Sequence, residues 1–186
     1  VSAGLYRRDY PTLIEAVRDL EVQVVVASHS PWITRKRRNP PSVSIPPNVR
    51  FARYSYYELR ELYARSLFVA VPLVHGTVTQ AGSLVIYEAM AMGKAVVATR
   101  TAGQEMLGIV REGETGMLVE PGDVQGWRRA ITHLLAHPEE AVRMGRRARS
   151  LVEEGLSMEG YVRQMVSVVE SVAAEARAAQ GAPTRP

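Results

Sequence analysis

The residue spacing with the clearest chemical meaning is a glycine followed at a distance by one carboxylate. Gly82 opens an apolar segment that predicts a helix, and Glu88 interrupts the apolar side of that helix six residues later. Free N–H groups in the first turn of a helix favour an anion such as a pyrophosphate. Glu88 then lies about two turns along, within reach of a neighbouring sugar hydroxyl. The alternative is a plain crossover helix with a solvated Glu88.

Alternating strand and helix patterns surround this segment. Because a parallel sheet needs a crossover between successive strands, the alternation predicts an α/β fold, a Rossmann-like doubly wound parallel sheet with helices on both faces. Capping signals for the early helices are Asp9 and the pair Ser55 and Glu58. The expected strands are residues 1–3, 22–27, 49–52, 67–71, 95–98 and 117–119.

The last third of the chain is helical by pattern. Asp123 caps one helix, Pro138 begins a second, and Ser157 begins a third that reaches about Ala179. We expect residues 1–180 to form one domain and residues 181–186 a disordered tail. The third helix carries an apolar stripe that is typical of core packing: Tyr161, Val162, Met165, Val168, Val169 and Val172.

Composition narrows the function classes. The 186 residues are 46% hydrophobic, enough for one sizeable core. The absence of cysteine excludes disulfides, thiolate metal sites and a cysteine nucleophile, and agrees with a reducing cytosol. The four histidines form no close ligand pattern, so no metal site is expected. The apolar run 67–74 is too short to span a bilayer. The chain begins with Val1, and we interpret it as a piece of a longer chain.

A net charge of +4 and a pI near 9.6 favour anionic partners. Part of the excess lies in Arg35–Arg38, within the proline-rich segment 29–47, which predicts an exposed, solvated loop. Nucleic-acid binding would favour aromatics beside the basic run, and only Trp32 is close. We therefore expect no nucleic-acid partner. Contact with an anionic membrane surface stays open as an alternative.

Five segments together resemble a known family: Ser2–Leu5, Arg8–Leu13, Asn48–Phe51, Tyr87–Thr99 and Gly113–Asp123. They resemble the C-terminal, donor-binding half of retaining GT-B glycosyltransferases of family 4. The resemblance implies a nucleotide-sugar-binding domain, with the N-terminal acceptor-binding domain absent from this chain. It implies transfer of a sugar, hexosyltransferase-like, from a nucleoside diphosphate sugar in the cytoplasm or peripherally at the inner membrane face. It implies neither cofactor nor metal, and an isolated fragment without turnover.

The resemblance assigns a phosphate-binding role to the loop after the first strand. The family's glycine and basic residue fall on Gly4 and Arg8, where a guanidinium can hold the pyrophosphate and offset the charge of the leaving diphosphate. Arg7 is a second candidate, and Leu5 stands where many members carry Arg. The alternative for Arg8 is an ordinary surface arginine near the cap at Asp9.

The family signature of two glutamates falls on Gln80 and Glu88. The resemblance implies that Glu88 accepts hydrogen bonds from the ribose hydroxyls. Gln80 departs from the pattern: its amide can hydrogen-bond a sugar hydroxyl but cannot act as a base or nucleophile. This leaves either a variant active site or a domain that binds without turnover. The backbone N–H groups of Gly82, Ser83 and Leu84 are expected to face the phosphates.

The nucleobase is expected near the loop after the strand 49–52. That places Arg53 and Tyr54 in range, together with residues 28–32. The alternative for Arg53 is an ordinary solvated surface residue. Residues 101–105 are candidates for contact with the sugar. Two alternatives from other classes remain: a non-catalytic nucleotide-binding or interaction domain with the same half fold, and a nucleic-acid-binding module built on the basic loop.

Overall fold

The computed structural model of the chain describes residues 1–28, 43–155 and 157–181. Within them, six parallel strands form one sheet in the order β3-β2-β1-β4-β5-β6. The predicted doubly wound α/β fold is confirmed. The strands are β1 (Ser2–Ala3), β2 (Val24–Ala27), β3 (Val49–Ala52), β4 (Phe68–Val71), β5 (Ala95–Thr99) and β6 (Gly116–Val119).

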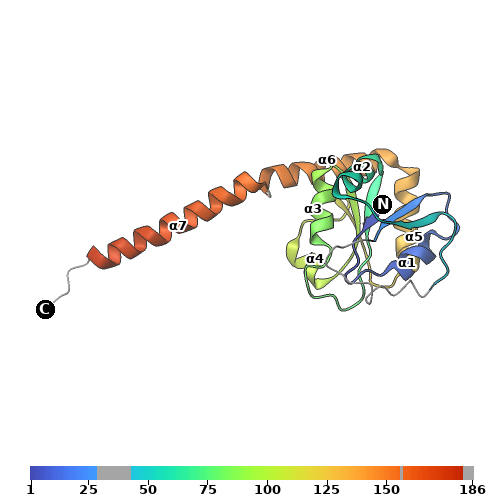
Figure 1. Cartoon of the computed structure of the whole chain (residues 1–186), viewed down its shortest axis with the longest axis horizontal. Coiled ribbons are helices and arrows are strands. Elements are labelled where there is room, and N and C mark those ends of the chain that lie inside the picture. The colour runs from blue at the N-terminus through green and yellow to red at the C-terminus, as the bar shows by residue number, and fades with distance from the viewer. Residues whose placement is uncertain (29–42, 156, 182–186) are drawn as a thin grey trace. The chain divides into compact units, whose positions relative to one another are not determined.

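Helices connect and cover the strands. Figure 1 shows α1 and α5 on one side of the sheet and α3 on the other. From β1 the chain steps one way to β2, and from β4 the opposite way to β5, so right-handed crossovers place their helices on opposite faces. The helices are α1 (Tyr10–Val17), α2 (Tyr56–Arg65), α3 (Ser83–Ala91), α4 (Ala102–Leu107), α5 (Val124–Ala136), α6 (Pro138–Gly155) and α7 (Met158–Gly181).

The capping residues that the sequence indicated begin the expected helices. Asp9 accepts a hydrogen bond from the Thr12 amide at 3.2 Å and starts α1. Ser55 and Glu58 form a reciprocal capping box at α2. Each cap satisfies a backbone donor that has no partner inside the helix. Helix α4, which begins at the Thr101 cap, is an element that the sequence patterns did not indicate.

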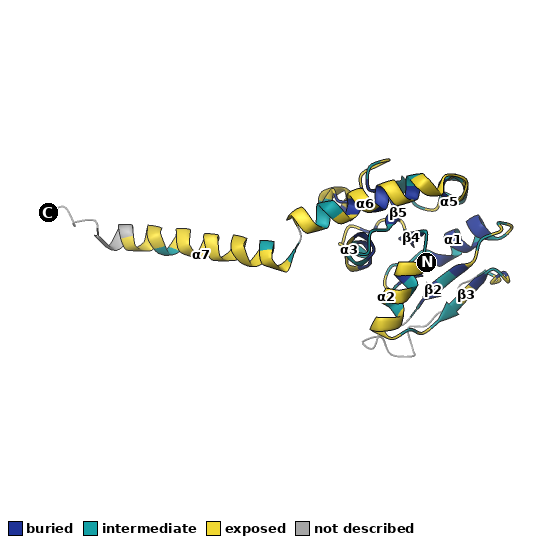
Figure 2. Cartoon of the chain, turned by 90° about the horizontal axis from the view of Figure 1, so that it is seen from above, coloured by how far each residue is buried: buried dark blue, intermediate teal, exposed yellow. Residues whose placement is uncertain are grey.

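The core lies on both faces of the sheet. On one face, Trp127 and Leu134 of α5 pack with α1 and with alternate strand residues, and Trp127 is 1% exposed, as the sequence predicted. On the other face, Ile86 and Met90 of α3 are fully buried. Because strands covered on both faces need apolar side chains throughout, β4 and β5 are buried along their whole length (Figure 2).

The chain divides into two compact units, Val1–Ser150 and Leu151–Pro186, and α7 belongs to the second. The expectation that the α7 stripe packs in the core is wrong. Its apolar side chains are exposed (Figure 2), and they are Tyr161, Val162, Met165, Val168, Val169 and Val172. Helical periodicity records which side of a helix is apolar, but not whether another element covers that side.

Candidate functional site

The loops after β1 and β4 meet at the edge where the strands end, which we call the carboxyl edge. The strand order reverses between these two neighbours, which makes this the topological switch point of the sheet. Backbone contacts join the loops: Arg8 bridges to Leu73 in antiparallel fashion, and the Asp9 amide donates to the Pro72 carbonyl at 3.1 Å. Open parallel sheets bind ligands in the crevice at such a point.

Arg8 lies folded over Gly4 in the loop after β1. Its Nε donates to the Ala3 carbonyl at 2.9 Å, and its Nη1 donates to the Tyr6 carbonyl at 3.0 Å. Gly4 has φ +97°, and a Cβ built on it would lie 2.7 Å from Nη2 of Arg8. Glycine is therefore required both by the backbone conformation and by the space that the guanidinium occupies.

The Arg8 charge is half-buried, and it lacks an acidic partner among the described residues. Burial lowers the pKa of the Arg8 guanidinium, although an arginine stays protonated at neutral pH. Among the residues that the structure describes, Arg8 bonds to carbonyl oxygens and forms no ion pair. A desolvated cation without a counter-charge is costly, and an anionic ligand at this position would offset that cost.

Helix α3 begins beside Arg8. Its N-cap, Gly82, has φ +87°, and a Cβ built there would lie 2.7 Å from Cγ1 of Val71 and 3.6 Å from Nη1 of Arg8. The start of α3 and the Arg8 guanidinium therefore lie side by side. The Ser83 amide is already engaged in this conformation, because it donates to the Gln80 carbonyl at 3.1 Å.

Glu88 faces α2 from the middle of α3. Its Oε2 accepts a hydrogen bond from the Tyr63 hydroxyl at 3.1 Å. Burial raises the pKa of the Glu88 carboxyl, and the Tyr63 hydrogen bond opposes that rise. Sequence reasoning missed Tyr63 as a polar partner. Tyr63 shares an apolar helix face with Leu59 and Leu62. This periodicity predicts that the ring packs in the core, and it is the same for a phenylalanine as for a tyrosine.

Gln80 is exposed in the loop between β4 and α3, and α4 packs against that loop. A Cβ built on Gly103 would lie 2.2 Å from the Thr79 carbonyl oxygen, so the two backbones touch. The Gln104 side chain donates from Nε2 to the Ala81 carbonyl at 3.1 Å, and its Oε1 is buried without a partner among the described residues. The signature position Gln80 is therefore carried by a loop that α4 holds.

The other predicted residues lie farther from this centre. Arg7, with φ +57°, turns to the β4 loop, where Nε donates to the Thr77 hydroxyl and Nη2 to the His75 carbonyl, both at 3.3 Å. Exposed Arg53 follows β3, two strands from β1, and the neighbouring Tyr54 hydroxyl accepts from Arg50 at 2.8 Å. The side chain of Leu84 is exposed at the start of α3.

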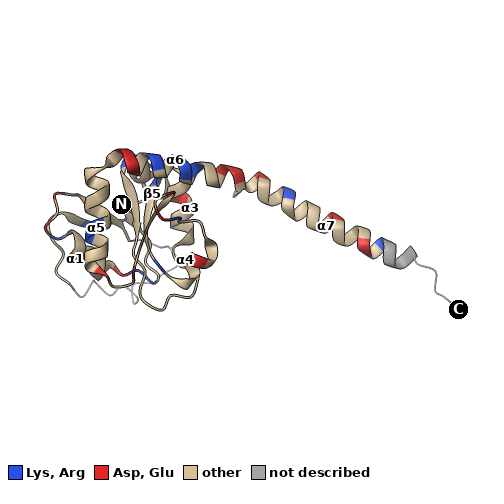
Figure 3. Ribbon diagram, turned by 180° about the vertical axis from the view of Figure 1, so that it is seen from behind, with Lys and Arg blue, Asp and Glu red and all other residues tan. Residues whose placement is uncertain are grey.

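Surface charge is mixed where the structure describes it. Acidic side chains lie at both ends of α6 and basic side chains between them (Figure 3). Arg143 pairs with Glu140 at 3.8 Å, and Arg147 pairs with Glu114 at 3.0 Å. Residues 29–32 and the basic run Arg35–Arg38 lie outside the described residues. None of the described helices is both long and apolar enough to cross a membrane.

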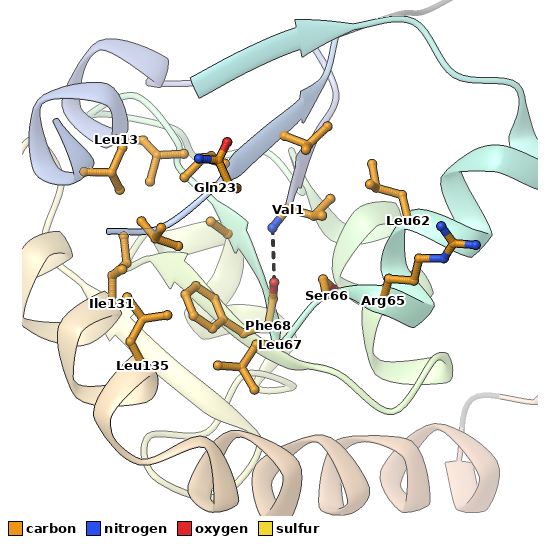
Figure 4. A pocket seen from close by; sticks show the side chains of 15 residues that line it. Val1, Leu13, Gln23, Leu62, Arg65, Ser66, Leu67, Phe68, Ile131 and Leu135 are labelled. Carbon is orange, nitrogen blue, oxygen red and sulfur yellow. Dashed lines mark hydrogen bonds between the residues drawn. The ribbon is translucent and has the colours of Figure 1, made fainter. Parts of the chain in front are cut away.

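A pocket of about 240 Å³ opens at the opposite, amino edge, where the strands begin (Figure 4). Its lining is mostly apolar and includes Leu13 and Val17 of α1, Phe68 of β4 and Ile131 of α5, together with residues 22–25 at the start of β2. Arg8, Gly82 and Glu88 are not part of its lining. The cavity and the polar groups that can bind an anion therefore lie at opposite ends of the same strands.

The chain resembles known proteins over much of its length. It is 32% identical over 115 residues to the D-inositol 3-phosphate glycosyltransferase of Corynebacterium urealyticum, covering 62% of this chain and 26% of that protein. It is 36% identical over 89 residues to the N-acetyl-alpha-D-glucosaminyl L-malate synthase of Bacillus anthracis, covering 48% of this chain and 23% of that protein. The matches thus span about a quarter of these relatives.

Solved structures show the same fold. The sucrose-phosphate synthase of Thermosynechococcus elongatus superposes with a TM-score of 0.74 at 24% identity, covering 94% of this chain and 45% of that one. HepE of Anabaena in complex with UDP-glucose superposes with a TM-score of 0.72 at 18% identity, covering 91% and 48%. The chain has the fold of one half of a GT-B glycosyltransferase.

Residues 5–137 match the family model described as glycosyl transferases group 1. The chain therefore belongs to the glycosyl transferases group 1 family.

Proposed function

We propose that this chain is the donor-binding domain of a retaining glycosyltransferase of family 4, and that it holds the diphosphate of a nucleoside diphosphate sugar between Arg8 and the start of α3. One observation carries the proposal. Arg8 is a half-buried cation at the switch point, 3.6 Å from a Cβ position on the N-cap of α3, without an acidic partner among the described residues. A diphosphate supplies the missing negative charge.

Two kinds of positive charge converge on the proposed phosphate position. The guanidinium of Arg8 can donate two parallel hydrogen bonds, and the N-terminus of α3 adds the positive end of the helix dipole. Both interactions strengthen as negative charge gathers on the departing diphosphate, so they favour the transition state over the bound substrate. In this proposal, Arg8 and the start of α3 stabilise the charge of the diphosphate without a metal ion.

The remaining groups contact other parts of the donor. Glu88 accepts hydrogen bonds from the ribose hydroxyls, and Gln80, in the loop against which α4 packs, contacts the sugar. Arg53 and Tyr54, at the end of β3, are placed to meet the base. An acceptor hydroxyl reaches the anomeric carbon from a second, N-terminal half, and closure of the two halves excludes water. The chain spans less than half of the sucrose-phosphate synthase and HepE chains, which is consistent with that second half.

The structural neighbours support the choice of ligand class. HepE was crystallised with UDP-glucose, and also with UDP and glucose, on a fold that this chain shares over 91% of its length. The proposal places the enzyme in the cytoplasm, where nucleotide sugars are available, with acceptors reached in solution or at the inner membrane face.

Calorimetric titration of the chain with UDP, GDP, ADP and their glucose conjugates tests the proposal. We expect one of the bases to bind, and Arg8→Gln to weaken that binding about 10- to 100-fold, the cost of losing hydrogen bonds between charged groups. Arg60→Gln is the matched control, because Arg60 lies exposed on α2 and pairs with Glu61. Binding that survives Arg8→Gln unchanged would contradict the assignment, and the absence of binding to every nucleotide would contradict the function.

A non-catalytic binding domain is the second candidate, and Gln80 is the observation that favours it. An amide in place of the signature carboxylate retains hydrogen bonding but removes a negative charge beside the sugar. Sugar-transfer assays on a protein that contains both halves distinguish the two candidates. Turnover with Gln80 present supports the enzyme, whereas tight donor binding with no turnover supports the binding domain.

A further inference from the structure

A side-chain hydrogen bond joins helices α2 and α3. The Tyr63 hydroxyl of α2 donates to Oε2 of Glu88 of α3 at 3.1 Å. Tyr63 is 2% exposed, whereas Glu88 is half-buried at the surface of the same contact. The hydrogen bond therefore runs from an immobile ring in the core to a carboxylate that solvent or a ligand can still reach.

The position of the Tyr63 ring is fixed by its surroundings. A buried tyrosine hydroxyl requires a hydrogen-bond partner, and packing around a fully buried ring leaves it one orientation. Within the described residues, Glu88 is the one partner of that hydroxyl. The carboxylate, in contrast, has two oxygens, and only Oε2 is engaged by a described side chain.

The tyrosine hydroxyl thus contacts the carboxylate that the proposed function places on the ribose. Burial and the Glu88 carboxylate raise the pKa of the Tyr63 hydroxyl, so the hydroxyl remains a proton donor at any physiological pH.

We propose that Tyr63 is a positioning residue: its hydroxyl fixes Oε2 of Glu88 and leaves Oε1 to accept hydrogen bonds from the ribose hydroxyls of a bound nucleotide. This inference rests on the proposed donor-binding function. It predicts that Glu88 acts on the ribose with one oxygen held in advance, so that little side-chain freedom is lost when the nucleotide binds.

The hydrogen bond has a second consequence, for the charge of Glu88. Burial raises the pKa of Glu88, and the Tyr63 hydroxyl partly reverses that rise by stabilising the carboxylate. Without the hydroxyl the pKa rises further. Glu88 would then be protonated, and would lose one acceptor, at a higher pH than in the wild-type chain.

The test is Tyr63→Phe, which removes one oxygen atom and keeps the ring. The chain and the variant are titrated with UDP, GDP and ADP over a range of pH. We expect about three- to tenfold weaker binding of the nucleotide that the wild-type chain binds, the usual effect of one hydrogen bond, and an acid limb of binding that moves to higher pH. The matched control is Tyr57→Phe on the same helix, where the side chain is exposed and no change is expected.

Two further variants separate positioning from a merely structural role. In a Glu88→Ala background, Tyr63→Phe should cost no further affinity, because the group on which Tyr63 acts is absent. Tyr63→Met, which keeps apolar volume without a hydroxyl, should repeat the loss if the Phe variant is too unstable to titrate. The inference, but not the proposed function, would be overturned by either of two results. One is a Tyr63→Phe variant with unchanged nucleotide affinity and an unchanged acid limb; the other is a Tyr63→Phe loss of affinity that is just as large in the Glu88→Ala background. Failure of the wild-type chain to bind all three nucleotides would overturn the proposed function and this inference with it.

Discussion

The two edges of the sheet are built from the same strands and differ in almost every other respect. At the amino edge, apolar side chains of α1, α5 and β4 line an open pocket. At the carboxyl edge, Gly4 and Gly82 in left-handed conformations let the guanidinium of Arg8 lie beside the start of a helix. The residues that line this pocket are therefore separate from the polar groups of the proposed site, which converge at the switch point.

The physical reason is that the direction of the chain determines which helix ends lie at each edge of the sheet. In a parallel sheet every following helix begins at the carboxyl edge, so its free N–H groups gather there and favour anions. The preceding helices end at the amino edge, where the connections back into the strands bring apolar side chains together. Mutations at the two edges should therefore separate stability from binding.

The largest expected effect is on stability, at the amino edge. Leu13→Ala empties a side-chain position that is 2% exposed, and we expect a loss of about 2–4 kcal/mol in the free energy of unfolding, with nucleotide affinity unchanged in the folded protein. Chemical denaturation and calorimetry measure the two quantities. Leu135→Ala, at an exposed part of the same wall, is the matched control and should cost under about 1 kcal/mol. A large loss of affinity from Leu13→Ala would break the contrast between the edges.

The next effect is on binding, at the carboxyl edge. Glu88→Ala should weaken binding of a nucleoside diphosphate by about 1–3 kcal/mol, because the ribose loses a hydrogen bond to a charged group. Titration calorimetry measures this loss. Glu61→Ala, an exposed acidic residue on α2, should leave the affinity unchanged. If Glu88→Ala has no effect, α3 is a structural crossover helix and the ribose assignment is wrong.

A smaller effect, of opposite sign for stability and for binding, is expected from Glu88→Gln. Burial raises the pKa of Glu88 in the folded chain, so its stability contribution is full below about pH 4 and is lost as pH rises through the folded pKa. Glu88→Gln carries no charge, so it should be more stable than the wild type at neutral pH and similar in acid. Because Glu88 is half-buried and solvent screens its charge, the gain should stay under about 1 kcal/mol.

Thermal unfolding at several pH values measures this difference, and calorimetry should show weaker nucleotide binding by the same Glu88→Gln variant. Improved stability with reduced binding is the pattern expected of a group kept for function. Equal stability of the two proteins at every pH would mean that Glu88 bears no desolvation cost.

The smallest effect sharpens the division inside the carboxyl edge. Gln80→Glu should leave binding of a bare nucleoside diphosphate unchanged, because Gln80 lies exposed on the loop ahead of α3 rather than on the helix itself. Binding of the nucleotide sugar should change, since the new carboxylate would face sugar hydroxyls. Parallel titrations with the nucleotide and its glucose conjugate measure both. A matching change in both ligands would show that Gln80 is not specific to the sugar.

Local sequence patterns predicted the elements well, because their causes are local. Asp9 and the pair Ser55 and Glu58 cap helices through bonds to residues three positions away, and apolar runs of strand length became β4 and β5. Helix α4 was missed because its few residues carry too little periodicity to detect. The phosphate-binding candidates Gly4, Arg8 and Gly82 were named from spacing and resemblance.

Long-range packing decided the rest. The sequence alone determined that Arg8 and Gly82 each follow a strand, whereas the strand order brought them together across more than seventy residues. An apolar face on α7 was equally visible in the sequence, yet its side chains are exposed, because periodicity cannot name a partner. Tyr63 looked like a packing residue for the same reason. Whether its hydroxyl meets water, a carbonyl or Glu88 depends on where another helix lies, and only the tertiary structure sets that position.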